Sequence, residues 1–79
     1  MRVLLFGPLA DTAGWRERLT PPAPDVETLK ARLGAEDPAL GAALMAPGIK
    51  VAADQKIIAD GAALAGVSEV AFLPPMSGG

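Results

Sequence analysis

The stretch Glu69-Val70-Ala71-Phe72-Leu73-Pro74-Pro75-Met76-Ser77-Gly78-Gly79 joins a strand pattern to an uncharged tail that ends in two glycines. Residues 69–73 alternate as in a strand, so Val70 and Phe72 are expected to point to the same face of a sheet. Pro74-Pro75 ends the sheet pairing, because proline has no N–H to donate to the ladder. The pattern predicts a last strand followed by a tail whose terminal carboxylate is the working group.

The opposite end of the chain contains the other strongly apolar strand. Arg2-Val3-Leu4-Leu5-Phe6 is a short apolar run stopped by Gly7-Pro8, which is typical of a buried strand. The first and last strands are the most apolar, so we expect them to form the central pair of a mixed sheet. The remaining strands are predicted to be an exposed hairpin strand at residues 15–19, a strand at 49–52 and a short strand at 57–58. Residues 9–14 are expected to be a loop or a short helical turn.

Two helices are predicted between the second and third strands. Asp25 is a plausible N-cap, because its carboxylate can accept a hydrogen bond from a first-turn amide. Apolar residues then recur at helical spacing up to Leu33, and Gly34 is expected to end this main helix. Asp37-Pro38 resembles a second helix start, for a short helix at residues 39–46. The sequence therefore predicts an α+β domain over residues 1–73, with both helices on one face of the sheet, and a flexible tail at 74–79.

The composition excludes several classes of site. The chain has no cysteine and no histidine, which removes disulfides, thiolate or imidazole metal ligands and a Ser-His triad. Its net charge is −2 with scattered basic residues, which argues against a nucleic-acid partner. No apolar run approaches the roughly 18 residues of a membrane span. We expect a cytoplasmic protein with no metal, no cofactor and no nucleotide site of its own.

Three segments carry a family resemblance. They are the opening Val3-Leu4-Leu5-Phe6, the middle segment Val51-Ala52-Ala53-Asp54-Gln55, and the ending from Glu69 to Gly79. The chain resembles the small, sulfur-carrying subunit of molybdopterin synthase, in the ubiquitin-like β-grasp group. A terminal Gly-Gly is common to that whole group, whereas the Pro-Pro-Met-Ser that precedes it here is typical of the molybdopterin branch. Asp54 and the segment 66–69 depart from the family pattern, and both are turn positions.

The resemblance implies a carrier rather than a complete enzyme. An activating enzyme would couple the Gly79 carboxylate to AMP, and a sulfur donor protein would convert the adenylate to a thiocarboxylate. The large subunit of molybdopterin synthase would supply the catalytic residues and hold the pterin precursor. The reactive and modified residue is then Gly79. The expected partner-binding residues precede it: Phe72, Leu73, Pro74, Pro75, Met76, Ser77 and Gly78.

Alternatives remain open at this stage. The chain could be a carrier for thiamine or tRNA thiolation, a protein modifier joined to lysines through Gly79, or a domain with an inert tail. Phe72 could be a core residue instead of a partner contact. Phe6 is expected in the core, with the partner surface as its alternative. Trp15 is expected to pack at the end of the sheet.

Overall fold

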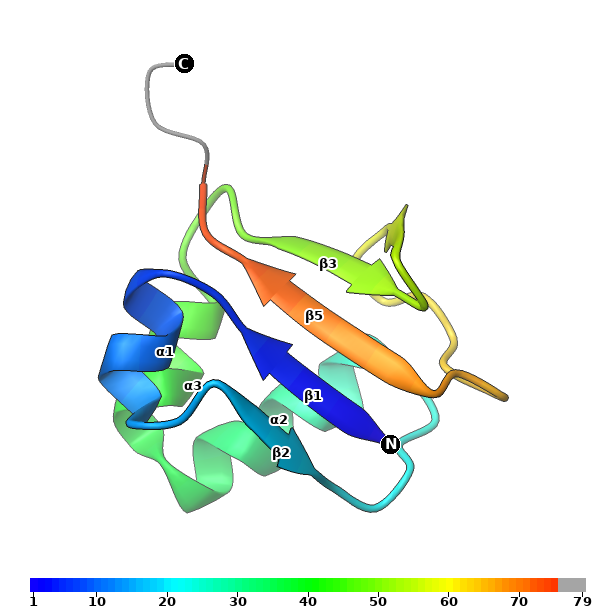
Figure 1. The fold of residues 1–79 in the computed structure, drawn as a ribbon, viewed down its shortest axis with the longest axis horizontal. Helices are drawn as coiled ribbons and strands as arrows, with labels where there is room; N and C mark the ends of the chain where they lie inside the picture. Colours follow the sequence, from blue (N-terminus) through cyan, green and yellow to red (C-terminus); the bar gives the residue numbers. More distant parts are fainter. Residues whose placement is uncertain (76–79) are drawn as a thin grey trace.

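The computed structural model describes residues 1–75 of the chain. In this part five strands and three helices follow one another along the chain (Figure 1). Their bounds are β1 Arg2–Leu5, α1 Pro8–Ala13, β2 Glu17–Leu19, α2 Val26–Glu36, α3 Pro38–Leu44, β3 Lys50–Ala53, β4 Lys56–Ile58 and β5 Glu69–Leu73.

The sheet has the strand order β2-β1-β5-β3-β4, with β5 in the middle. β1 and β5 are parallel and in register from Arg2 opposite Glu69 to Leu5 opposite Phe72. The other three pairs are antiparallel. The predicted central pairing of the first and last strands is therefore confirmed. β5 lies between β1 and β3 in the sheet. Its last residues therefore lie between the loop that follows β1 and the loop that precedes β3.

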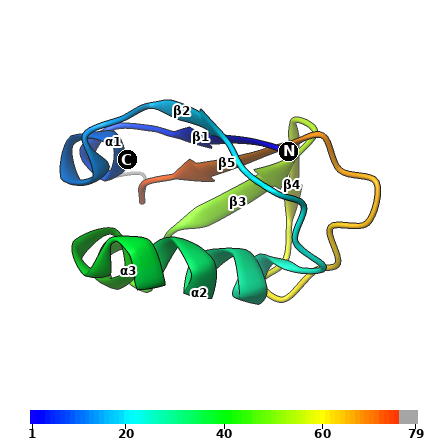
Figure 2. The ribbon, with the colours of Figure 1, turned by 90° about the horizontal axis from the view of Figure 1, so that it is seen from below.

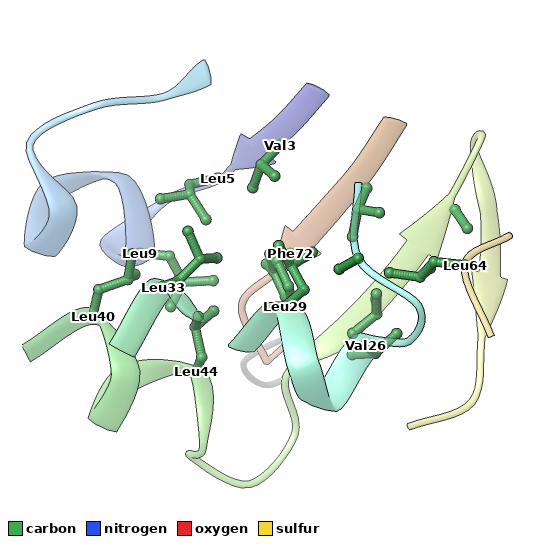
Figure 3. Packing of buried hydrophobic residues seen from close by; sticks show 14 of the residues in the cluster. Val3, Leu5, Leu9, Val26, Leu29, Leu33, Leu40, Leu44, Leu64 and Phe72 are labelled. Atoms are coloured by element: carbon green, nitrogen blue, oxygen red, sulfur yellow. The ribbon is translucent and has the colours of Figure 1, made fainter. Parts of the chain in front are cut away.

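The helices α2 and α3 lie together against one face of the sheet, and the other face carries no helix (Figure 2). The core fills the space between these layers (Figure 3). Alternating residues of the central strands point into it, as predicted, and Val3, Val70 and Phe72 are 0% exposed. Leu29 and Leu33 of α2 and Leu40 of α3 meet them from the helical layer. The mixed sheet with a main and a short helix on one face is confirmed.

The main helix begins as predicted but ends later. The Asp25 carboxylate accepts a hydrogen bond from the Thr28 amide at 2.7 Å, which makes Asp25 the N-cap. Gly34 does not end the helix, which continues to Glu36. The reason for glycine at this position is the neighbouring helix: a Cβ built on Gly41 of α3 would lie 2.6 Å from the Gly34 Cα. The two glycines allow α2 and α3 to touch through their backbones.

Replacing Gly41 with Ala is expected to lower the free energy of unfolding by about 1–2 kcal/mol. The overpacking costs about 1–3 kcal/mol, which outweighs the gain of about 1 kcal/mol in helix propensity. Urea denaturation measures the change. Ala42, an exposed residue of the same helix, provides the control, because Ala42→Gly reports the propensity difference without the contact. An increase in stability for Gly41→Ala would contradict this account of the helix contact.

The N-cap makes stability depend on pH. The hydrogen bond from the Thr28 amide lowers the pKa of Asp25 below its usual 3.8. A carboxyl group whose pKa is lower in the folded state stabilises the fold above its unfolded pKa, and this contribution is lost as the pH falls through the folded pKa. The stability advantage of wild type over Asp25→Asn is expected to shrink below about pH 4. Denaturation from pH 6 to pH 2 tests this, and a constant difference would disprove it.

Several boundaries differ from the sequence-based prediction. Residues 8–13 form a true helix, closed by Gly14 at a φ of 81°. The hairpin strand β2 is shorter than residues 15–19, and Trp15 packs against the core beside it, as expected, with the Arg18 guanidinium 4.4 Å from its ring centroid. The turn between β3 and β4 uses Asp54 and Gln55, both at positive φ, as a two-residue hairpin with a type I′ turn requires. The Asp54 carboxylate also accepts hydrogen bonds from the amides of Ser68 and Glu69, at the start of β5.

Candidate functional site

The candidate site is the end of β5, where the chain leaves the sheet. Exposure increases stepwise along it: Phe72 is 0% exposed, Leu73 and Pro74 are partly buried, and Pro75 is exposed. In Figure 1 this segment leaves the sheet beside the connection from β1 to α1 and the connection from α3 to β3. The described chain thus passes within a few residues from the centre of the core to the surface.

Phe72 belongs to the core, so its expected role as a partner contact is wrong for its side chain. It is the largest fully buried side chain of the described residues and lies at the middle of the core view (Figure 3). The alternative named for it, a core residue, is the one observed. Phe72 contributes to the site by holding the end of β5 in place. Its carbonyl also accepts a hydrogen bond from the Phe6 amide at 3.3 Å.

Phe6 shows the reverse error. It was expected in the core, but it is 44% exposed. Val3 and Leu5 of β1 point into the core, and side chains alternate along a strand, so Phe6 falls on the face without helices. The sequence contained a signal for this position. Arg2 and Phe6 lie an even number of positions apart, so they fall on the same face of an extended segment, and the charged Arg2 indicates that this face is open to solvent. Phe6 and Leu73 are thus apolar residues available at the surface beside the exit of the chain.

The open face of the sheet continues this apolar surface. The strand register places Leu4, Ala71, Ala52 and Ile57 next to one another, in one row across four strands. Ile57 is 63% exposed, whereas Ala71 and Ala52 are only 7% and 8% exposed. We call this row, together with Phe6 and Leu73, the open-face strip. An apolar strip of this kind on a small domain is typical of a surface that binds another protein.

A hollow of about 260 Å³ lies next to Phe6. Leu4, Phe6 and Gly7 form its apolar part, and the charged side chains Asp11 and Arg16 contribute to the rest of its wall. It adjoins the open-face strip through Leu4 and Phe6. Because its lining is partly apolar and partly charged, it suits a partner's side chain that has an apolar stem and a polar end.

Pro74 and Pro75 each face a glycine from a neighbouring loop. A Cβ built on Gly7 would lie 3.2 Å from Cγ of Pro74, and one built on Gly48 would lie 2.9 Å from Cβ of Pro75. Contacts of the folded domain therefore extend to Pro75, two residues beyond the end of β5. The other predicted site residues, Met76, Ser77, Gly78 and Gly79, lie outside the described residues.

The part of the chain that the structure describes has an apolar interior. Within residues 1–75 all the buried side chains are apolar. No group of three or more Asp or Glu side chains in this part could hold a metal ion. No helix in it is long and apolar enough to cross a membrane. What the site provides is a shaped apolar surface and a chain end that leaves from its centre.

The fold and the exit of the chain from the central strand define a ubiquitin-like β-grasp protein. The chain belongs to the ThiS family, whose model matches residues 3–79. The structure is similar to that of SAMP1 from Haloferax volcanii, with a TM-score of 0.81 and 31% identity over 100% of this chain and 98% of that one. A second structure, small archaeal modifier protein 1 of H. volcanii, has a TM-score of 0.75 and 28% identity, covering 96% of this chain and 97% of that one.

These similarities establish the type of protein and do not distinguish between the pathways in which proteins of this type act. The search of curated proteins gave no match. The family and the structural neighbours identify a ubiquitin-like protein of the sulfur-carrier or modifier type. The expected fold is confirmed by them, and the expected class of function is confirmed at this level.

Proposed function

We propose that this protein is the sulfur carrier of molybdopterin synthesis, with Gly79 as its reactive residue. The observation that carries the proposal is the ending Pro74-Pro75-Met76-Ser77-Gly78-Gly79, attached directly to the central strand of a β-grasp sheet. Six residues span about 20 Å when extended, enough to enter a deep partner site. Two glycines add no side-chain bulk and accept backbone angles closed to other residues.

The chemistry takes place on the main chain. The Gly79 carboxylate attacks the α-phosphate of ATP bound to an activating enzyme, which forms the acyl adenylate and releases pyrophosphate. Sulfur at the sulfide level, from a donor protein, then attacks the acyl carbon and displaces AMP, which leaves a thiocarboxylate. The ionised sulfur is the nucleophile, by the same logic as a cysteine thiolate. The sulfur attacks a carbon of the pterin precursor and displaces a leaving group from it, which forms a thioester to Gly79. Hydrolysis of the thioester leaves the sulfur on the pterin and returns the carboxylate. ATP belongs to the partner throughout.

The open-face strip is the surface that would dock these partners. Phe6 and Leu73 lie next to the exit of the chain, so a protein bound there is already positioned to receive the residues that follow Pro75. The activating enzyme and the large synthase subunit would use this surface in turn, and the catalytic residues would be theirs. The buried Phe72 supports the surface without touching the partner. The cytoplasm, which contains ATP and the pterin precursor, is the compartment this role requires.

Intact mass spectrometry of the protein purified from its own host tests the proposal. Replacing one terminal oxygen by sulfur adds about 16 Da, the same shift as a methionine sulfoxide. Fragmentation must therefore assign the added mass to Gly79 and also read the native end of the chain. A shift confined to the methionines, under growth conditions that require molybdenum cofactor, would contradict the proposal.

A protein modifier is the second candidate, and the similarity to small archaeal modifier protein 1 favours it. Its product would be an isopeptide bond between Gly79 and a lysine of a target. Blots of host lysate for a tagged chain would then show a ladder of higher-mass species resistant to reductant. A sulfur carrier for thiamine or tRNA thiolation is distinguished from the first proposal by deleting the gene. The amounts of molybdopterin, thiamine and thiolated tRNA in the host are then measured.

A further inference from the structure

We propose that Gly7 and Gly48 are positioning residues that set the direction in which the chain leaves the domain, and that they thereby present Gly79 to the partner's reactive site. This inference rests on the proposed carrier function. It concerns two loops that lie far from Gly79 in the sequence. We call Gly7 and Gly48 the exit glycines.

The exit glycines are brought to the same place by the sheet order. Gly7 follows β1 and Gly48 precedes β3, and these two strands flank β5. Each strand therefore contributes one glycine beside the point where β5 ends. Both have a positive φ, 56° for Gly7 and 86° for Gly48, which L side chains rarely adopt.

The contacts explain why both positions lack a side chain. A Cβ on Gly48 would lie 2.9 Å from Cβ and 3.2 Å from Cγ of Pro75. A Cβ on Gly7 would lie 3.2 Å from Cγ of Pro74. Positive φ alone does not produce such contacts, because a Cβ on Gly61 or Gly66, at φ 80° and 76°, would have no atom within 4 Å.

Prolines suit this arrangement because their φ angle is fixed. Pro74 lies against the bare backbone of Gly7 and Pro75 against that of Gly48, so the chain leaves the domain in a defined direction. This arrangement favours a carrier, because conformational freedom that the chain has already lost in the free protein is not lost again when the chain enters the partner's site. Displacing a reacting group by about 1 Å can cost around 100-fold in rate. The methyl of an alanine at Gly48 would lie 2.9 Å from Cβ of Pro75, so Pro75 would have to move by about 1 Å to reach an ordinary contact distance. The residues up to Gly79 follow Pro75 in the chain, so they would be presented from a displaced position.

The test compares Gly48→Ala with Gly61→Ala and Gly66→Ala. All three variants carry the same backbone strain, and only the first contacts the prolines. Purified protein is added to host extract with ATP and a sulfide source, and the initial rate of mass gain at Gly79 is measured as a function of protein concentration. Gly48→Ala is expected to lower the maximal rate by about tenfold or more relative to the two controls. The concentration for half-maximal rate should stay unchanged, because the open-face strip is intact.

A second pair of measurements separates positioning from loss of folding. Pro75→Gly removes the two side-chain atoms closest to a methyl on Gly48, so the double variant Gly48→Ala/Pro75→Gly is expected to recover the rate of Pro75→Gly alone. Residual dipolar couplings of the Pro74 and Pro75 Cα–Hα bonds should change in Gly48→Ala and remain as in wild type in Gly61→Ala. These couplings need no partner, so they report the exit direction even if Gly48→Ala is less stable.

The outcomes distinguish this inference from the proposed function. Equal maximal rates for Gly48→Ala and Gly61→Ala, or unchanged couplings, would overturn the positioning role while the carrier function stands. A wild-type chain that gains no sulfur in the extract, although the couplings shift in Gly48→Ala, would instead overturn the carrier function and with it the delivery of Gly79.

Discussion

Replacing Phe72 with Ala is expected to lower the free energy of unfolding by about 3–5 kcal/mol, the range for a fully buried phenylalanine. Phe72 is 0% exposed and lies on the central strand, facing the helical layer. A domain of this size has a modest total stability, so a loss of this order would leave a large unfolded fraction. Thermal denaturation followed by circular dichroism should show Tm lower by more than about 12 °C.

Leu73→Ala is the matched control for this prediction. Leu73 is the next residue of the same strand but points to the open face, where it is only partly buried. Its loss should change Tm little and weaken binding of the activating enzyme instead. If Phe72→Ala folds as stably as Leu73→Ala, the assignment of Phe72 to the core is wrong.

Deleting Gly78 and Gly79 is expected to abolish sulfur loading and to leave stability unchanged. The core of the part that the structure describes ends at Phe72, before the two deleted residues. The remaining chain would present a carboxylate two residues too early, about 7 Å short of its place in the partner. The mass gain at the chain end should vanish, and a host that carries only this variant should make no molybdenum cofactor.

A chain with one extra alanine after Gly79 separates length from the mere presence of a carboxylate. It keeps both glycines and a free carboxylate, displaced by about 3.5 Å. We expect it to fold normally and to load no sulfur unless the host removes the added residue. Cofactor synthesis that survives the deletion of both glycines would refute the carrier function.

The sheet and the main helix could be predicted because their signals are local. The alternation around Phe72 and the capping side chain of Asp25 each lie within a few residues of what they determine. Gly34 was misassigned as a helix end because its role depends on Gly41, a residue of the next helix. The sequence of residues 8–13 does not distinguish a loop from a short helix, because six residues between two glycines show little periodicity.

The candidate site divides in the same way. The ending from Pro74 to Gly79 indicated the function class directly, because the sequence motif is itself the functional element. The surface around it was not predictable from single segments. The row from Leu4 to Ile57 requires the strand register, and the contacts of Gly7 and Gly48 with the prolines require the strand order. Phe6 is the exception, since the parity it shares with Arg2 could have placed it on the open face.

The parallel pairing of β1 and β5 has a mechanical consequence. The N-terminus lies at one end of this pair, and the chain leaves β5 at the other end (Figure 1). A force applied between the N-terminus and the segment after β5 acts parallel to both strands. The hydrogen bonds between β1 and β5 are then loaded in shear, so they share the force. The domain should therefore resist a pull on the segment that follows β5, which the proposed partners would bind.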